Sequence, residues 1–159
     1  IGRSCTQKLP TSSKMSELKE DFEAFLAGLQ LRFFSPGELS RYANATRNGV
    51  KNDLPPRELW VNLVRPLWVL DQLREDIGLP IKITSSYRSP DYNQAVGSSS
   101  GSFHRKASAL VFQVIGMSPI QVFNKLNKMR HAGSWTGGLG SYPTFTHIDA
   151  GLRPRNATW

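Results

Sequence analysis

The sequence predicts an α+β domain in which helices pack on a small, mainly antiparallel sheet. The first observation is the order of hydrophobic patterns along the chain: helix, helix, strand, strand, helix and then strands. The second is size, because 159 residues with 39% hydrophobic and 20% charged residues suit one domain with a sizeable core. Residues 13–159 are therefore expected to form a single domain, preceded by a polar, aperiodic tail over residues 1–12.

Two helices are expected near the start of this domain. Apolar residues recur at helical spacing from Ser13 to Leu29, which is typical of an amphipathic helix with one face on the core. The segment Ser35-Pro36-Gly37-Glu38 has the form of a capping box with proline at the first helical position. A short second helix should begin there.

The longest helical pattern follows a loop at residues 52–56 and ends at Gly78. Its inward positions are expected to be Leu59, Leu63, Leu67, Leu70, Leu73 and Ile77. Pro66 lies inside the pattern and should kink or split it. Trp60 and Trp68 are interpreted as core residues, and the alternative is that they stack on sugars in a cleft.

Residues 80–85, 109–115, 137–143 and 145–149 are predicted to form strands. In the first two segments, residues of different character alternate, as expected of half-buried strands. One face of the second strand, with its leucine and phenylalanine, is predicted to be core. The other face looks toward something less apolar and carries Ala109, Val111 and Gln113.

One further helix is expected between the second and third strands. It begins at Ser118-Pro119 and ends at Gly133. Its expected inward residues are Ile120, Phe123, Leu126 and Met129. Lys128, Arg130 and His131 fall in the last turn, where positive charge complements the helix dipole. This accounts for His131 without a metal and excludes it from the predicted site.

The two remaining histidines and one aspartate are the candidate site. His104 lies just before the strand 109–115, where a loop can aim its side chain over the less apolar face. His147 and Asp149 point to the same side of their own strand because side chains repeat every two residues. Two imidazoles and a carboxylate can therefore converge.

These segments resemble the zinc D-Ala-D-Ala carboxypeptidase family, which includes L-Ala-D-Glu endopeptidases of bacteria and phages. The family pattern is Ser-x-His-x-x-Gly-x-Ala-x-Asp followed by His-x-Asp, and the matching residues here are Ser102, His104, Ala109, His147 and Asp149. The similarity covers roughly residues 35 to 155. It extends through residues 83–90, Tyr92-Asn93, Val96-Gly97, residues 138–143 and Gly151-Leu152-Arg153.

The resemblance implies the hedgehog/DD-peptidase fold and a zinc peptidase directed at peptidoglycan stem peptides. It implies His104 and His147 as zinc ligands, with Asp149 orienting its neighbours or substituting as a ligand. Arg88 would bind a substrate carboxylate or stabilise the oxyanion, unless it pairs with Asp91 or caps a carbonyl. Further substrate contacts are expected from Tyr87, Ser102 and Tyr142, although Tyr142 could instead cover the core.

Two positions depart from the family pattern, and a third lacks an acidic group that some relatives carry. Ala107 stands in place of glycine, and Val111 stands in place of the aspartate that is the third zinc ligand. Thr144 occupies the position where dipeptide-specific relatives carry an acidic general base. Because a catalytic zinc normally has three protein ligands and an open position for water, weak zinc binding and impaired hydrolysis are expected.

The net charge of +8 is compatible with several kinds of partner. An anionic cell-wall polymer would be attracted by this charge, but general solubility explains it without a partner. Nucleic acid is disfavoured because the basic residues are dispersed and no aromatic residues are interleaved for stacking. No apolar run approaches the length of a membrane span, and Cys5, as the single cysteine, excludes an internal disulfide or a cysteine-based zinc site.

Two functional hypotheses therefore remain. The first is a zinc peptidase-like domain that acts on or binds stem peptides. The second is a non-catalytic cell-wall-binding or structural module, for instance in a phage virion. Either implies a protein that is exported to the periplasm or cell wall or that belongs to a virion, and the absence of methionine at Ile1 suits a removed or omitted upstream segment.

Overall fold

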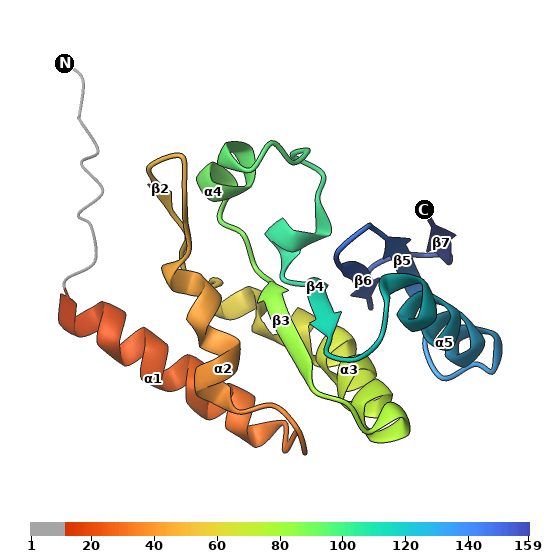
Figure 1. Ribbon diagram of the computed structural model, residues 1–159. Helices are drawn as coiled ribbons and strands as arrows, with labels where there is room; N and C mark the ends of the chain where they lie inside the picture. Colours follow the sequence, from red (N-terminus) through yellow and green to blue (C-terminus); the bar gives the residue numbers. More distant parts are fainter. Residues whose placement is uncertain (1–11) are drawn as a thin grey trace.

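The structure is a computed structural model and describes residues 12–159 (Figure 1). The α-helices are α1 (Ser12–Gly28), α2 (Pro36–Ser40), α3 (Val64–Ile77), α4 (Pro90–Ala95) and α5 (Pro119–His131). Short 3₁₀ helices are η1 (Arg41–Asn44), η2 (Arg57–Leu63) and η3 (Phe103–Lys106). No helix in this part of the chain is long and apolar enough to cross a membrane. The predicted tail and Cys5 lie outside the described residues, except that Ser12 begins α1.

The strands form one main sheet and one hairpin. They are β1 (Thr46–Arg47), β2 (Val50–Lys51), β3 (Ile81–Ser85), β4 (Ala109–Val114), β5 (Gly137–Ser141), β6 (Thr146–Ala150) and β7 (Ala157–Thr158). The main sheet has the order β3-β4-β6-β5-β7 and is antiparallel except between β5 and β7. The predicted α+β class with a small, mainly antiparallel sheet is confirmed. Figure 1 shows α1 and α2 at one end of the molecule and α5 with β5 and β7 at the other.

The hydrophobic core lies between this sheet and the helices α3 and α5. It joins Leu70 of α3 and Leu126 of α5 to Leu110 and Phe112 of β4. Successive side chains of a strand point to opposite faces, so Val111 points away from this core. The candidate site lies on that second face.

Local sequence signals set the ends of the helices. The Ser35 hydroxyl accepts a hydrogen bond of 3.3 Å from the backbone N–H of Glu38, whose carboxylate accepts one from the N–H of Ser35. Ser118 and Gln121 form the same capping box at the start of α5. Gly78 ends α3 in the left-handed conformation, with φ of +66°, which suits glycine.

The long helical pattern is split, as predicted, into η2 and α3. Pro66 lies in the first turn of α3, where a residue without an N–H group loses no intrahelical hydrogen bond. Trp60 of η2 is buried and donates its indole N–H to the Pro55 carbonyl at 2.8 Å. The interpretation of Trp60 as a core residue is therefore confirmed.

Two predicted core positions are wrong. Trp68 is 48% exposed, because Leu67 and Leu70 occupy the inward face of α3 and each helical residue turns the chain by about 100°. Ile120 is 57% exposed at the start of α5. Val122 is buried in its place and continues the inward face to the next turns.

Candidate functional site

The register of β4 and β6 brings the predicted site residues together. Val111 pairs with His147, and Ala109 pairs with Asp149, across the antiparallel ladder. The ring centroid of His104 lies 5.3 Å from that of His147, with the rings edge to face. The predicted convergence of two imidazoles and a carboxylate thus appears on the sheet face that points away from the core.

His104 is held in η3 with one ring nitrogen already used. The Ser102 hydroxyl accepts a 3.2 Å hydrogen bond from the backbone N–H of His104 and so caps the first turn of η3. The Nδ1 atom of His104 lies 2.6 Å from the Ser86 carbonyl oxygen. Because a carbonyl only accepts, Nδ1 carries the proton and Nε2 keeps its lone pair.

The environment of His104 keeps the imidazole neutral. The side chain is 3% exposed, and burial together with the charge of Arg88 and the proximity of His147 lowers its pKa to about 3. A neutral imidazole with a free nitrogen is a hydrogen-bond acceptor or a metal ligand at physiological pH.

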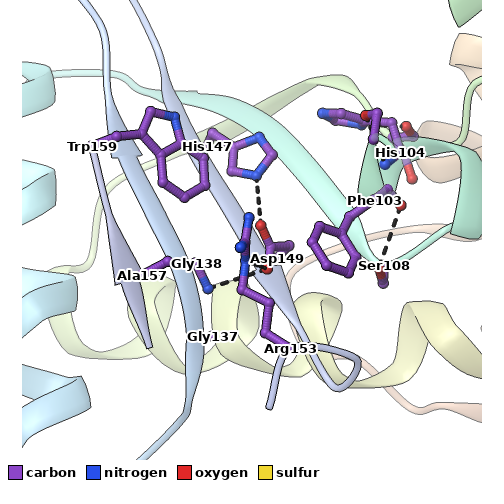
Figure 2. A network of polar contacts seen from close by, with 12 residues as sticks. Phe103, His104, Ser108, Gly137, Gly138, His147, Asp149, Arg153, Ala157 and Trp159 are labelled. Carbon is purple, nitrogen blue, oxygen red and sulfur yellow. Dashed lines mark hydrogen bonds and ion pairs between the residues drawn. The ribbon is translucent and has the colours of Figure 1, made fainter. Parts of the chain in front are cut away.

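Asp149 is the most highly connected residue of the site (Figure 2). It is 1% exposed, and its Oδ2 atom lies 2.9 Å from Nε2 of His147. Its Oδ1 atom accepts hydrogen bonds from the Gly138 N–H at 3.2 Å and from Nε of Arg153 at 2.6 Å. Burial alone would raise the pKa of Asp149, but the hydrogen bonds from His147 and Arg153 outweigh it and lower the pKa. The carboxylate is therefore ionised and fully engaged.

The same contact fixes the tautomer of His147. An ionised carboxylate only accepts, so in the neutral imidazole of His147 the proton lies on Nε2 and Nδ1 keeps its lone pair. One open nitrogen on His147 and one on His104 therefore remain for a ligand.

Arg88 lies beside these histidines without a carboxylate partner. Its backbone N–H donates to the His104 carbonyl at 3.0 Å, and its Nε donates to the Ser85 hydroxyl at 3.2 Å. Burial lowers the pKa of Arg88. Within residues 12–159 no ion pair joins it to Asp91 or to another acid, so its terminal nitrogens are available to a ligand.

The other predicted substrate contacts occupy different positions. Tyr87 is 5% exposed, and its ring belongs to the hydrophobic core, so its substrate role remains a prediction. Tyr142 stacks on Phe145 with ring centroids 4.5 Å apart, and its hydroxyl accepts a 2.7 Å hydrogen bond from the indole N–H of Trp159. Tyr142 thus lies in an aromatic group that reaches His147 through Trp159, whose ring centroid is 5.0 Å from the imidazole.

Two partners of the site residues were not predicted from the sequence, one of His104 and one of Asp149. Ser86 acts through its backbone carbonyl, which no side-chain pattern can reveal. Arg153 donates to Asp149 from the segment after β6, and the family resemblance assigns it no role. Ala107 has a φ of +57°, a left-handed conformation that favours glycine and explains why glycine suits this position in relatives.

Comparison with known proteins shows the family of this chain. The family model of peptidase M15 matches residues 32–149, which is well over half of the chain. The chain belongs to the peptidase M15 family. The probable peptidoglycan L,D-endopeptidase MepK of Haemophilus influenzae is 28% identical over 128 residues, which cover 74% of this chain and 63% of that protein. The chain therefore spans less than two thirds of the length of this relative.

M15 peptidases depend on zinc, and the donor set of this member is incomplete for that metal. Nε2 of His104 and Nδ1 of His147 are suitable donors, each oriented by a hydrogen bond from the other ring nitrogen. Val111 supplies no donor atom, and both oxygens of Asp149 are engaged. Among residues 12–159, no three His, Cys, Asp or Glu side chains are placed to hold a metal ion. These residues do not fit a catalytic zinc with three protein ligands.

Proposed function

We propose that this chain binds stem peptides of peptidoglycan at the sheet face that carries His104 and His147 and hydrolyses them far more slowly than members with a complete metal site. The observation that carries the proposal is the pairing of Val111 with His147 on the site face of the sheet. A valine there leaves the family's zinc site one ligand short. The hydrogen bonds that orient both imidazoles are nevertheless present.

Arg88 is the residue proposed to bind a carboxylate of the stem peptide. A planar guanidinium makes two parallel hydrogen bonds to a carboxylate, and half-burial strengthens such bonds by excluding water. Support comes from its free terminal nitrogens and from its backbone hydrogen bond to His104. The open nitrogens of His104 and His147 would accept hydrogen bonds from N–H groups of the same peptide.

No catalytic step is assigned to a metal in this proposal. In a complete M15 site, zinc supplies an activated water and polarises the scissile carbonyl. The two imidazoles of this chain do not reproduce that site, and Thr144 provides no carboxylate at the position of the general base. Binding is therefore the function that the available groups support best.

Titration calorimetry with purified stem peptides tests the proposal. We expect saturable binding by the unmodified chain, and we expect Arg88→Gln to weaken it by about 10- to 100-fold, the loss of a hydrogen bond to a charged group. Mass spectrometry of the same mixtures should find the peptides largely uncleaved after long incubation.

Arg57→Gln is the matched control, because it removes the same charge from an arginine that pairs with Asp21 on the surface. This variant should bind as the unmodified chain does. Equal weakening by both variants would show a general charge effect. Rapid cleavage by the unmodified chain would refute the proposed loss of hydrolysis.

Location and partners follow from the same proposal. The relative from Haemophilus influenzae is named for action on peptidoglycan, which suits a chain that works in the periplasm, in the cell wall or on a phage particle. The alternative function is a non-catalytic cell-wall-binding module or a structural module of a virion, and only the virion module predicts folding without any affinity for stem peptides. The calorimetry therefore separates the virion module from the proposed function.

A further inference from the structure

Arg153 lies between two aromatic rings at the edge of the site. Its guanidinium carbon is 4.5 Å from the ring centroid of Phe103 and 5.1 Å from that of Trp159. Both distances fall within the range of cation–π attraction. Figure 2 shows Arg153 beneath Asp149, with Phe103 and Trp159 on either side.

In this position between the two rings, Nε of Arg153 points toward Asp149. This Nε donates to Oδ1 of Asp149 at 2.6 Å, while the other carboxylate oxygen accepts from Nε2 of His147. The carboxylate is almost fully buried, so its orientation depends on these donors and not on water. Asp149 therefore connects Arg153 to His147.

The surrounding backbone leaves this arrangement little freedom. A Cβ atom added to Gly138 would lie 2.5 Å from Oδ2 of Asp149 and 2.6 Å from Nε of Arg153. Only glycine lets β5 approach so closely, and its N–H supplies the third donor to the carboxylate. The carboxylate thus has one orientation in which all of its partners are satisfied.

We propose that Arg153 is the positioning residue of His147. By fixing the Asp149 carboxylate, it keeps the proton of His147 on Nε2 and leaves the lone pair of Nδ1 free. The proposal rests on the proposed function, in which Nδ1 accepts a hydrogen bond from an N–H group of a stem peptide held by Arg88. Arg153 itself does not touch the peptide.

If Arg153 only stabilised the fold, its role would be the same as that of Arg130. Arg130 holds the C-terminal strand through hydrogen bonds to the Ala157 carbonyl at 2.8 Å and the Thr158 hydroxyl at 2.7 Å. Its guanidinium carbon also lies 5.5 Å from the ring centroid of Trp135. Arg130 has the same chemistry as Arg153 but makes no hydrogen bond to Asp149, so Arg130→Gln is a matched control.

Nitrogen NMR of the histidine rings measures the tautomer directly. The full chain would be labelled at the ring nitrogens and studied at about pH 8, well above the ordinary histidine pKa. In the unmodified chain, the Nε2 atom of His147 should carry the proton. Arg153→Gln should mix the two tautomers of His147 and weaken stem-peptide binding by about 10- to 100-fold, as removal of an orienting partner does.

Three comparisons decide the outcome. Arg130→Gln should leave the His147 tautomer unchanged. Arg153→Lys should keep part of the signal of the Nε2-protonated His147 tautomer, because an ammonium group also donates to the carboxylate. His104 reports on folding in every spectrum, since the Ser86 carbonyl fixes its tautomer independently. Loss of the His104 signal in Arg153→Gln would show that this variant is unfolded. Arg153→Lys then tests the positioning role, which predicts partial mixing of the two His147 tautomers.

An unchanged His147 tautomer in folded Arg153→Gln or in Arg153→Lys would overturn the positioning role. Absence of peptide binding by the unmodified chain, together with a His147 tautomer that responds to Arg153, would instead refute the proposed function and leave the positioning role intact. The two failures are therefore distinguishable.

Discussion

The imidazole of His104 couples the site to the stability of the whole chain. In the folded state its pKa is lowered to about 3 by burial and by Arg88, whereas an unfolded histidine titrates near 6.5. The unfolded state therefore binds the proton first as the pH falls. The stabilising contribution is complete above about pH 6.5 and is lost progressively between there and about pH 3.

We predict that the free energy of unfolding falls by about 3 kcal/mol between pH 7 and pH 4 because of this residue. Urea denaturation in the presence of a chelator measures it, since only protons then compete for the imidazole. His104→Gln should flatten this pH dependence. An equal slope in the unmodified chain and in His104→Gln would contradict the burial argument.

The positions of single side chains were predicted correctly where the period of a strand sets the direction of the side chain. The alternation of side chains is sufficient to place His147 and Asp149 on one side, and the position before β4 is sufficient to bring His104 near them. The contacts of Arg153 could not be predicted in this way. They depend on how the segment after β6 folds back between Phe103 and Trp159, which is a tertiary contact without a local pattern.

At the scale of elements, α3 shows which face of a helix contributes to stability. Leu70 is fully buried against the sheet, whereas Trp68 is nearly half exposed. We predict that Leu70→Ala lowers the free energy of unfolding by about 2–5 kcal/mol, because it leaves a cavity in the core. Trp68→Ala should cost less than about 1 kcal/mol. Denaturant titrations of both variants check this, and a larger loss for Trp68→Ala would contradict the observed burial.

Segments with a clear period or a capping signal were predicted well, and short segments with neither a period nor a recognised signal were not. α1, α3, α5 and the four strands β3 to β6 appear near their predicted positions, because amphipathic periods and capping residues are local signals. The hairpin β1–β2, helix α4 and strand β7 are too short to show a period. Ile120 was misplaced because an apolar residue in a first helical turn can face either way.

At the scale of the whole molecule, the residues of the hydrophobic core and those of the candidate site lie on opposite faces of the main sheet. The helices α3 and α5 bury one face of the sheet, and the opposite face presents His104, His147 and Asp149. A change on the second face can therefore alter the reaction while the core stays intact. Val111 is such a position, because in the proposed function it stands where a metal ligand is expected, while the orienting hydrogen bonds of both imidazoles are in place.

The zinc content of the chain shows whether Val111 leaves the metal site incomplete. The unmodified chain, Val111→Asp and the control Val111→Ala would be dialysed together against trace zinc and analysed by elemental mass spectrometry. We expect about one zinc per chain in Val111→Asp alone, since a carboxylate there completes a set of three protein ligands. One zinc per chain in the unmodified protein, bound as tightly as in Val111→Asp, would contradict this expectation.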